Sequence, residues 1–179
     1  MSIPRRILCA ACFLAFAGAG LAATPSRHEV LAAISVLERN VTGDDAVNAA
    51  KTIVVYAQDS DDVEVDIGPA QLPWVSEEWG LDKPRELECQ SMLLAAFVAG
   101  NIKSQIKNAR VEDDTYSGWV FAIATYNRLR AKGSFRSASL DELSRMEADG
   151  TLLEHARRVQ KQEDQPEPQN GEPQHTPLA

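Results

Sequence analysis

The chain has 179 residues, of which 26 are Asp or Glu and 18 are Lys or Arg, so its formal net charge is −8. This charge argues against a nucleic-acid partner or an anionic membrane surface, because binding to polyanions depends on Lys and Arg side chains that neutralise phosphates. The length is sufficient for one domain around one hydrophobic core.

The first 23 residues have the pattern of a cleavable secretory signal peptide. Arg5 and Arg6 precede an uncharged apolar stretch, and small residues follow up to Ala23, just before a Thr-Pro-Ser start. This order is typical of a signal peptide rather than of a spanning helix. The Arg-Arg pair also leaves open export in the folded state, although ordinary secretion fits its flanking residues better. We therefore expect residues 1–23 to be removed and the mature protein to be periplasmic or secreted.

The cysteines limit disulfide formation. Cys9 and Cys12 fall within the predicted signal peptide, so the exported protein would keep Cys89 alone and could form no internal disulfide. Cys89 lies in an apolar helical segment, which favours a small core residue. The alternative is an intermolecular disulfide that links two copies of the chain through Cys89.

Helical periodicity begins directly after the predicted signal peptide. Ser26-Arg27-His28-Glu29 has the spacing of a capping box, and apolar residues recur at helical intervals to about Asn40. A second helix is expected from Asp44 or Asp45 to about Gln58. These two segments predict an antiparallel pair, each helix with one apolar stripe to bury.

The period changes between residues 59 and 73. Val63, Val65 and Ile67 alternate with acidic residues and a Gly-Pro pair follows, which predicts a short extended segment near 63–67 with no evident partner strand. Residues 73–80, bounded by Pro and Gly, are expected to form one or two helical turns.

Two long helices, over residues 84–108 and 114–132, form the predicted centre of the fold. Residues 89–102 carry no charge and are apolar in nearly all directions, so other helices should surround them. This stretch rises only about 21 Å along a helix, which is short of the roughly 30 Å of a bilayer core, and we predict no membrane span. Trp119 and Tyr116 fall on the apolar stripe of the second helix and are expected in the core.

The end of the chain contains two further helix starts and a tail. Capping boxes occur at residues 139–142 and 151–154, with Gly150 placed to end the first of these helices. Residues 163–179 contain several prolines and no aromatic residue, which predicts a disordered Pro- and Gln-rich tail. The fold prediction is therefore all-α, with five or six antiparallel helices over residues 24–162.

Residues 93–132 weakly resemble one tetratricopeptide unit. Ala99-Gly100-Asn101-Ile102 occupies the first helix of the unit and Ala122-Ile123-Ala124-Thr125-Tyr126 the second. The connection over 107–115 is longer than in that family, and no second copy follows at a period of about 34 residues. An antiparallel helical hairpin accounts for the same residues, so we assign no family.

Few residues suggest a specific chemistry. Ser104 and Lys107 match the Ser-x-x-Lys motif of serine penicillin-interacting enzymes, but the Ser-Asp-Asn and Lys-Thr-Gly elements of those enzymes are missing. The three histidines are far apart and lack metal-ligand spacing. The acidic run 59–66 offers oxygen ligands for calcium but departs from the EF-hand pattern. We therefore assign no catalytic, cofactor-binding or metal-binding residue.

The sequence leaves three functional hypotheses. The preferred one is an exported non-catalytic protein that binds another protein in the periplasm, with Trp74 and Trp79 as candidate contact residues unless they pack in the core. One version is an immunity protein that binds a cationic toxin, towards which the acidity would steer it. The alternatives are a small-ligand or calcium-binding protein with a pocket near Trp74, and an enzyme with a site assembled from dispersed residues such as His28, Glu154 and His155.

Overall fold

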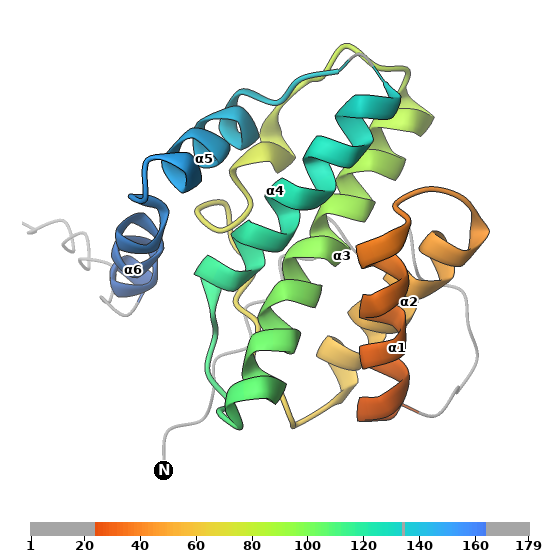
Figure 1. Cartoon of the computed structure of the whole chain (residues 1–179), viewed down its shortest axis with the longest axis vertical. Helices are drawn as coiled ribbons and strands as arrows, with labels where there is room; N and C mark the ends of the chain where they lie inside the picture. The colour runs from red at the N-terminus through yellow and green to blue at the C-terminus, as the bar shows by residue number, and fades with distance from the viewer. Residues whose placement is uncertain (1–23, 134, 164–179) are drawn as a thin grey trace, which may run out of the picture.

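The computed structural model describes residues 24–133 and 135–163, which form six α-helices and one short 3₁₀ helix without any β-strand (Figure 1). This confirms the predicted all-α fold. The predicted signal peptide and the predicted tail beyond Glu163 lie outside the described residues. The elements are α1 (Arg27–Arg39), α2 (Asp44–Asp59), η1 (Pro73–Ser76), α3 (Lys83–Asn108), α4 (Thr115–Lys132), α5 (Ala138–Ala148) and α6 (Leu152–Glu163).

Short polar side chains mark the starts of the helices. The capping box predicted for α1 is present, because the Glu29 N–H donates to the Ser26 hydroxyl and the Ser26 N–H donates to the Glu29 carboxylate. Asp82 accepts from the N–H of Arg85 at the start of α3, with Pro84 in the first turn. At the C-terminal end of α5, Gly150 has a φ of +75° and separates this helix from α6.

The predicted cap of α5 is wrong by two residues. Ser137, not Ser139, precedes the helix and accepts from the N–H of Leu140 at 3.2 Å. Ser139 instead donates to the Glu77 carboxylate through both its N–H and its hydroxyl. Burial alone would raise the pKa of Glu77, but hydrogen bonds from Ser137, Ser139 and Trp79 together lower it. Glu77 therefore ties the segment before α3 to α5, a contact that no local pattern reveals.

Helices α3 and α4 form the centre of the fold, as predicted. Every residue from 92 to 102 on α3 is buried. The two helices approach closely at two glycines: a Cβ atom on Gly100 would lie 2.2 Å from the backbone oxygen of Ser117, and one on Gly118 would lie 2.6 Å from the ring of Phe97. Only a hydrogen atom in place of a side chain allows this approach.

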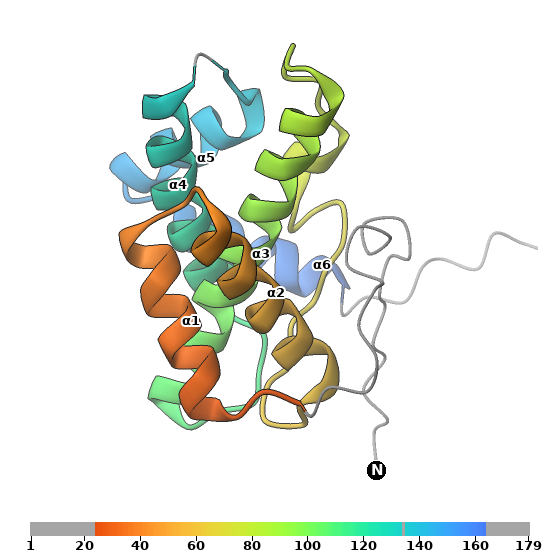
Figure 2. The same cartoon turned by 90° about the vertical axis from the view of Figure 1, so that its right-hand side faces the viewer.

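The remaining helices flank this central pair. Helices α1 and α2 pack together on one side of α3 and α4, and α5 and α6 lie on the other (Figure 1, Figure 2). The contact of α1 and α2 with the central pair is strongly apolar, since Ile34, Leu37 and Ile53 are each 1% exposed or less. None of the described helices combines the length and the apolar composition that a membrane span requires.

Candidate functional site

Two adjoining hollows flank the connection between α3 and α4, residues 109–114. The first, the polar hollow, has a volume of about 210 Å³ and lies between this connection and α6. It is lined by Ser104, Gln105, Asn108, Arg110, Glu112, Asp113, Asp114, Tyr116, Leu153, Ala156, Arg157 and Gln160. The second, the groove, has a volume of about 610 Å³ and runs along α3 and α4 beside α1. It is lined by Glu38, Gly100, Lys103, Ser104, Lys107, Asn108, Asp114, Tyr116, Ser117, Val120, Phe121, Ala124 and Arg128.

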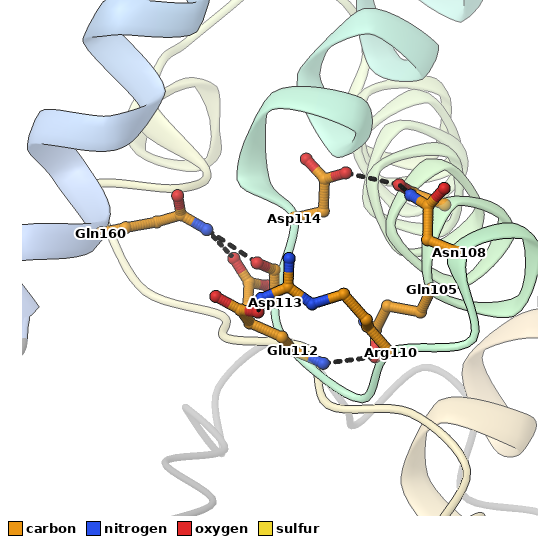
Figure 3. Close-up of polar contacts among 8 residues, drawn as sticks. Gln105, Asn108, Arg110, Glu112, Asp113, Asp114 and Gln160 are labelled. Carbon is orange, nitrogen blue, oxygen red and sulfur yellow. Dashed lines mark hydrogen bonds and ion pairs between the residues drawn. The ribbon is translucent and has the colours of Figure 1, made fainter.

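Asp113 organises the polar hollow (Figure 3). One of its carboxylate oxygens accepts from the N–H of Asp66 at 3.0 Å and from the amide of Asn101 at 2.5 Å. The other accepts from the hydroxyl of Thr115 at 2.7 Å and from the amide of Gln160 at 3.2 Å. One carboxylate thus joins the loop before η1 to α3, α4 and α6. Such charge-assisted hydrogen bonds are stronger than neutral ones, and here they hold four parts of the chain together.

Gln105 provides the partner that the extended segment 63–67 lacks in the sequence. Its side-chain oxygen accepts from the N–H of Glu64 at 3.0 Å, and its side-chain nitrogen donates to the carbonyl of Glu64 at 2.6 Å. The Gln105 amide therefore makes the two hydrogen bonds to Glu64 that the backbone of a neighbouring strand would otherwise make. The same oxygen accepts from the N–H of Glu112 at 3.2 Å. Gln105 is 3% exposed, so these bonds satisfy polar atoms that would otherwise be buried at a cost.

Ser104 is committed to the packing of α3 on α4. Its hydroxyl donates to the carboxylate of Asp114 at 2.5 Å and accepts from the amide of Asn108 at 3.2 Å. Asp114 also accepts from both the N–H and the hydroxyl of Ser117 and thereby caps the start of α4. Among the described residues no hydrogen bond joins Ser104 to Lys107. The serine of the Ser-x-x-Lys motif therefore makes contacts that fix the C-terminal end of α3.

The rim of the polar hollow is more open than its floor. Leu153 and Arg157 of α6 line it, and Leu153 is 41% exposed. Arg110 and Glu112 also line it and form an ion pair with each other. The interior of this hollow contains polar side chains that bond to one another, and Leu153 adds one exposed apolar side chain at its rim.

The groove has an apolar wall formed by α4. Val120, Phe121 and Ala124 line it and are partly or fully exposed. Tyr116 belongs to the same wall. The prediction that Tyr116 lies in the core is confirmed in part, because the residue packs against the hydrophobic core but is only partly buried and lines the groove. Trp119, which is fully buried, occupies the core as predicted.

Three cationic residues line the groove: Lys103, Lys107 and Arg128. Lys103 forms an ion pair with Glu38 of α1. Arg128 donates to the backbone carbonyl of Leu37 at 2.9 Å, which positions the guanidinium without neutralising it. No carboxylate of the described residues forms an ion pair with Lys107 or Arg128. No sequence pattern predicts this arrangement, because the three residues are spread over two helices among the many charges of an acidic chain.

Both tryptophans of residues 73–80 are buried by the protein itself. Trp74 is fully buried and meets the ring of Phe97 edge to face, with 6.5 Å between centroids. Trp79 is 7% exposed, stacks on Phe135 at 5.3 Å and donates to Glu77. Neither lines the polar hollow or the groove. This burial matches the core packing that the sequence also allowed, and contact with a partner through either indole stays a prediction.

The residues named for a dispersed catalytic site are not brought together. His28 is exposed in the first turn of α1, whereas Glu154 and His155 belong to α6, across the central pair of helices (Figure 1). His155 stacks on the ring of Trp119 with 5.1 Å between centroids. Burial, together with the positive charge of Arg158, lowers the pKa of His155. The imidazole therefore favours its neutral form and packs on the core.

The acidic run 59–66 makes contacts with the protein. Asp62 accepts from the hydroxyl of Tyr56 at 3.2 Å and forms an ion pair with Arg27 at 3.3 Å. In the part of the chain that the structure describes, no group of three or more His, Cys, Asp or Glu side chains is arranged to hold a metal ion. The geometry therefore adds no support to the calcium hypothesis.

Cys89 is partly buried on α3 and packs against the hydrophobic core. Burial, and to a smaller extent the negative charge of Glu88, raises the pKa of the thiol. A raised pKa lowers the thiolate fraction at neutral pH and with it the reactivity of the sulfur. These features favour the packing interpretation, and a disulfide-linked dimer stays a prediction.

Comparisons with known proteins add no assignment. No protein-family model matches the chain, and no curated protein or solved structure matches it either. The function must therefore be argued from the two hollows and from the sequence.

Proposed function

We propose that this chain is an exported, non-catalytic helical protein that binds another protein in the periplasm. The observation that carries the proposal is the groove, which combines an apolar wall on α4 with two cations, Lys107 of α3 and Arg128 of α4, that have no carboxylate partner among the described residues. An exposed apolar surface edged by charge is typical of sites where proteins bind one another. The signal-peptide pattern of residues 1–23 supports export.

The polar side chains near the groove support a binding role over a catalytic one. Ser104, Gln105, Asp113 and Asp114 all bond to other parts of the protein. A catalytic group needs a free atom directed at a reacting bond, together with a base or acid within hydrogen-bond reach. These side chains instead hold the connection between α3 and α4 in a fixed shape, which is what a rigid binding surface requires.

An immunity protein is one specific form of this proposal. The net charge of −8 would attract a cationic toxin over distances beyond direct contact. This form predicts that a neighbouring gene encodes a basic exported toxin, and that co-expression of the two proteins restores growth. If the captured partner carries no toxicity, the immunity form is excluded while protein binding stands.

The polar hollow favours a second candidate function, the binding of a small ligand. Its volume of about 210 Å³ is below the 300–1,000 Å³ typical of sites for drug-sized molecules, so only a small polar molecule would fit. A thermal-shift screen of the mature protein against calcium and small polar metabolites tests it. A dose-dependent rise in Tm that is abolished by Arg157→Ala would support this alternative.

Chemical crosslinking in the native compartment tests the main proposal. Cells that produce the full chain with a C-terminal tag are treated with amine-reactive crosslinkers of several lengths, and the tagged product is recovered and identified by mass spectrometry. We expect one protein partner to be recovered reproducibly. A variant without residues 2–23, which should remain in the cytoplasm, is the control. Recovery of no partner at any crosslinker length would contradict the proposal.

A further inference from the structure

We propose that the groove binds an acidic, amphipathic segment of the partner protein. This inference rests on the proposed function and deepens it, because it names the surface used and the chemistry of what occupies it. Three features support it: the charge of the groove, the shape of its apolar wall, and the contrast between this groove and the rest of an acidic chain.

The local charge of the groove opposes the charge of the whole protein. Acidic residues outnumber basic ones by 26 to 18 over the chain, yet Lys103, Lys107 and Arg128 line the groove against two acids, Glu38 and Asp114. The carboxylate of Asp114 keeps its charge but is held by hydrogen bonds from Ser104 and Ser117, so the cations outnumber the acids of the groove by three to two. A carboxylate on the partner would meet cations here and acids over much of the remaining surface.

Lys107 and Arg128 are the cations that such a carboxylate would find available. No carboxylate of the described residues pairs with either of them, and the carbonyl of Leu37 fixes the position of Arg128. Lys103 can contribute as well, since its ion pair with Glu38 lies at the surface, where such pairs add little to stability. A partner carboxylate could therefore replace Glu38 at small cost.

The apolar wall sets the length of the segment. It follows α4 from Tyr116 through Val120 and Phe121 to Ala124, and Arg128 stands one turn further on. Residues 116–128 rise about 18 Å along the helix axis. That distance corresponds to about three turns of a helix, or to five or six residues of extended chain. A segment with two or three apolar side chains on one face and acids beside them would match both the wall and the cations.

Site-specific photo-crosslinking tests this inference in the full exported chain. A benzophenone amino acid replaces Ala124, which is exposed and lines the groove, and in a matched variant it replaces Ala131, which is exposed on the same helix and lines neither hollow. Illumination is followed by mass spectrometry of the crosslinked peptides. We expect the Ala124 probe alone to capture a segment of another protein in which Asp and Glu outnumber Lys and Arg.

Charge reversal then separates local recognition from net charge. Lys107→Glu should lower the yield of the Ala124 crosslink at least about tenfold, because it places like charges together. Lys51→Glu, on an exposed residue of α2 outside the groove, changes the net charge equally and should leave the yield within about twofold. Equal losses for both variants would show that only net charge matters and would overturn the inference.

The other outcomes also decide the question. Capture of a basic or neutral segment, of a second copy of this chain, of the chain's own residues or of a phospholipid would contradict the inference, as would equal capture at Ala124 and Ala131. If chemical crosslinking recovers a partner while the Ala124 probe captures nothing, the groove is not the site but the proposed function stands. If neither method recovers a partner, both proposals fail.

Discussion

The polar hollow and the groove share Ser104, Asn108, Asp114 and Tyr116, but they use their charges differently. In the polar hollow, the carboxylate of Asp113 accepts four hydrogen bonds, of which Figure 3 shows the one from Gln160, and other polar side chains bond to one another. In the groove, Lys107 and Arg128 have no carboxylate partner among the described residues. The polar hollow has the larger number of polar residues, but these residues mainly hold the fold together.

This contrast separates residues that hold the fold from residues that are available to a partner. Burying a polar group is unfavourable unless it is hydrogen-bonded, so a buried and bonded group such as Gln105 is explained by the fold itself. The exposed Lys107 beside the apolar wall of the groove forms no such network within the described residues. Substitutions in the shared framework should therefore reduce stability most, and substitutions of exposed groove residues should reduce it least.

The largest loss of stability is expected where α3 meets α4. Gly100→Ala would place a Cβ atom 2.2 Å from a backbone oxygen, and Gly118→Ala would place one 2.6 Å from the ring of Phe97. Each should lower the free energy of unfolding by about 3 kcal/mol, at the upper end of overpacking costs, as measured by urea denaturation. Gly133→Ala is the matched control, because its Cβ atom would meet nothing closer than 3.5 Å. Equal stability of all three variants would contradict the close packing.

Loss of the Asp113 carboxylate should be the next largest effect. Asp113→Ala removes the carboxylate that accepts from the Asp66 N–H, the Asn101 amide and the Thr115 hydroxyl, which should cost about 2–3 kcal/mol in unfolding free energy. Glu112→Ala, on the neighbouring exposed carboxylate that among the described residues pairs with Arg110 alone, should change stability by less than about 0.5 kcal/mol. Similar losses for the two variants would mean that the network does not hold the loop.

A smaller effect should appear in the pH dependence of stability. Because burial and Arg158 lower the pKa of His155 in the folded state, the unfolded chain binds a proton at higher pH than the folded one. This contribution to stability is therefore present above the ordinary pKa of about 6.5 and is lost as the pH falls through the folded-state value. Between pH 7.5 and 5, His155→Gln should lose less stability than the unchanged protein, with a difference of less than about 1 kcal/mol. A larger loss in the variant would reverse the sign of this account.

Charge reversal in the groove should have the smallest effect on folding. Lys107 is exposed, so Lys107→Glu should change the unfolding free energy by less than about 0.5 kcal/mol, with Lys51→Glu as the control for net charge. Circular dichroism and urea denaturation measure this directly. A loss of several kcal/mol would show that Lys107 supports the fold, and the groove would then resemble the polar hollow.

Much of the helical framework could be predicted because its signals are local. The capping box at Ser26 and Glu29, the uncharged middle of α3 and the turn at Gly150 all depend on residues within a few positions of each other. The cap of α5 shows where local signals are insufficient. Ser137 and Ser139 both suit a helix start, and it is Glu77, 62 residues from Ser139 along the chain, that engages the second of them.

The candidate site could not be predicted, because its contacts join distant segments. Gln105 bonds to Glu64 at a separation of 41 residues, and Asp113 bonds to Asp66 and to Gln160 at 47 residues each. In the sequence Gln105 is an ordinary polar residue near a helix end. The groove depends in addition on α1 lying beside α3 and α4, which requires the packing of the whole domain.

The most direct test of the account compares one charge reversal in each hollow. Lys107→Glu in the groove and Arg157→Glu at the rim of the polar hollow are both exposed and change the net charge by the same amount. The partner recovered by crosslinking is quantified for the unchanged protein and for both variants at equal expression. The account predicts that Lys107→Glu loses the partner and Arg157→Glu retains it, and the reverse result would contradict it.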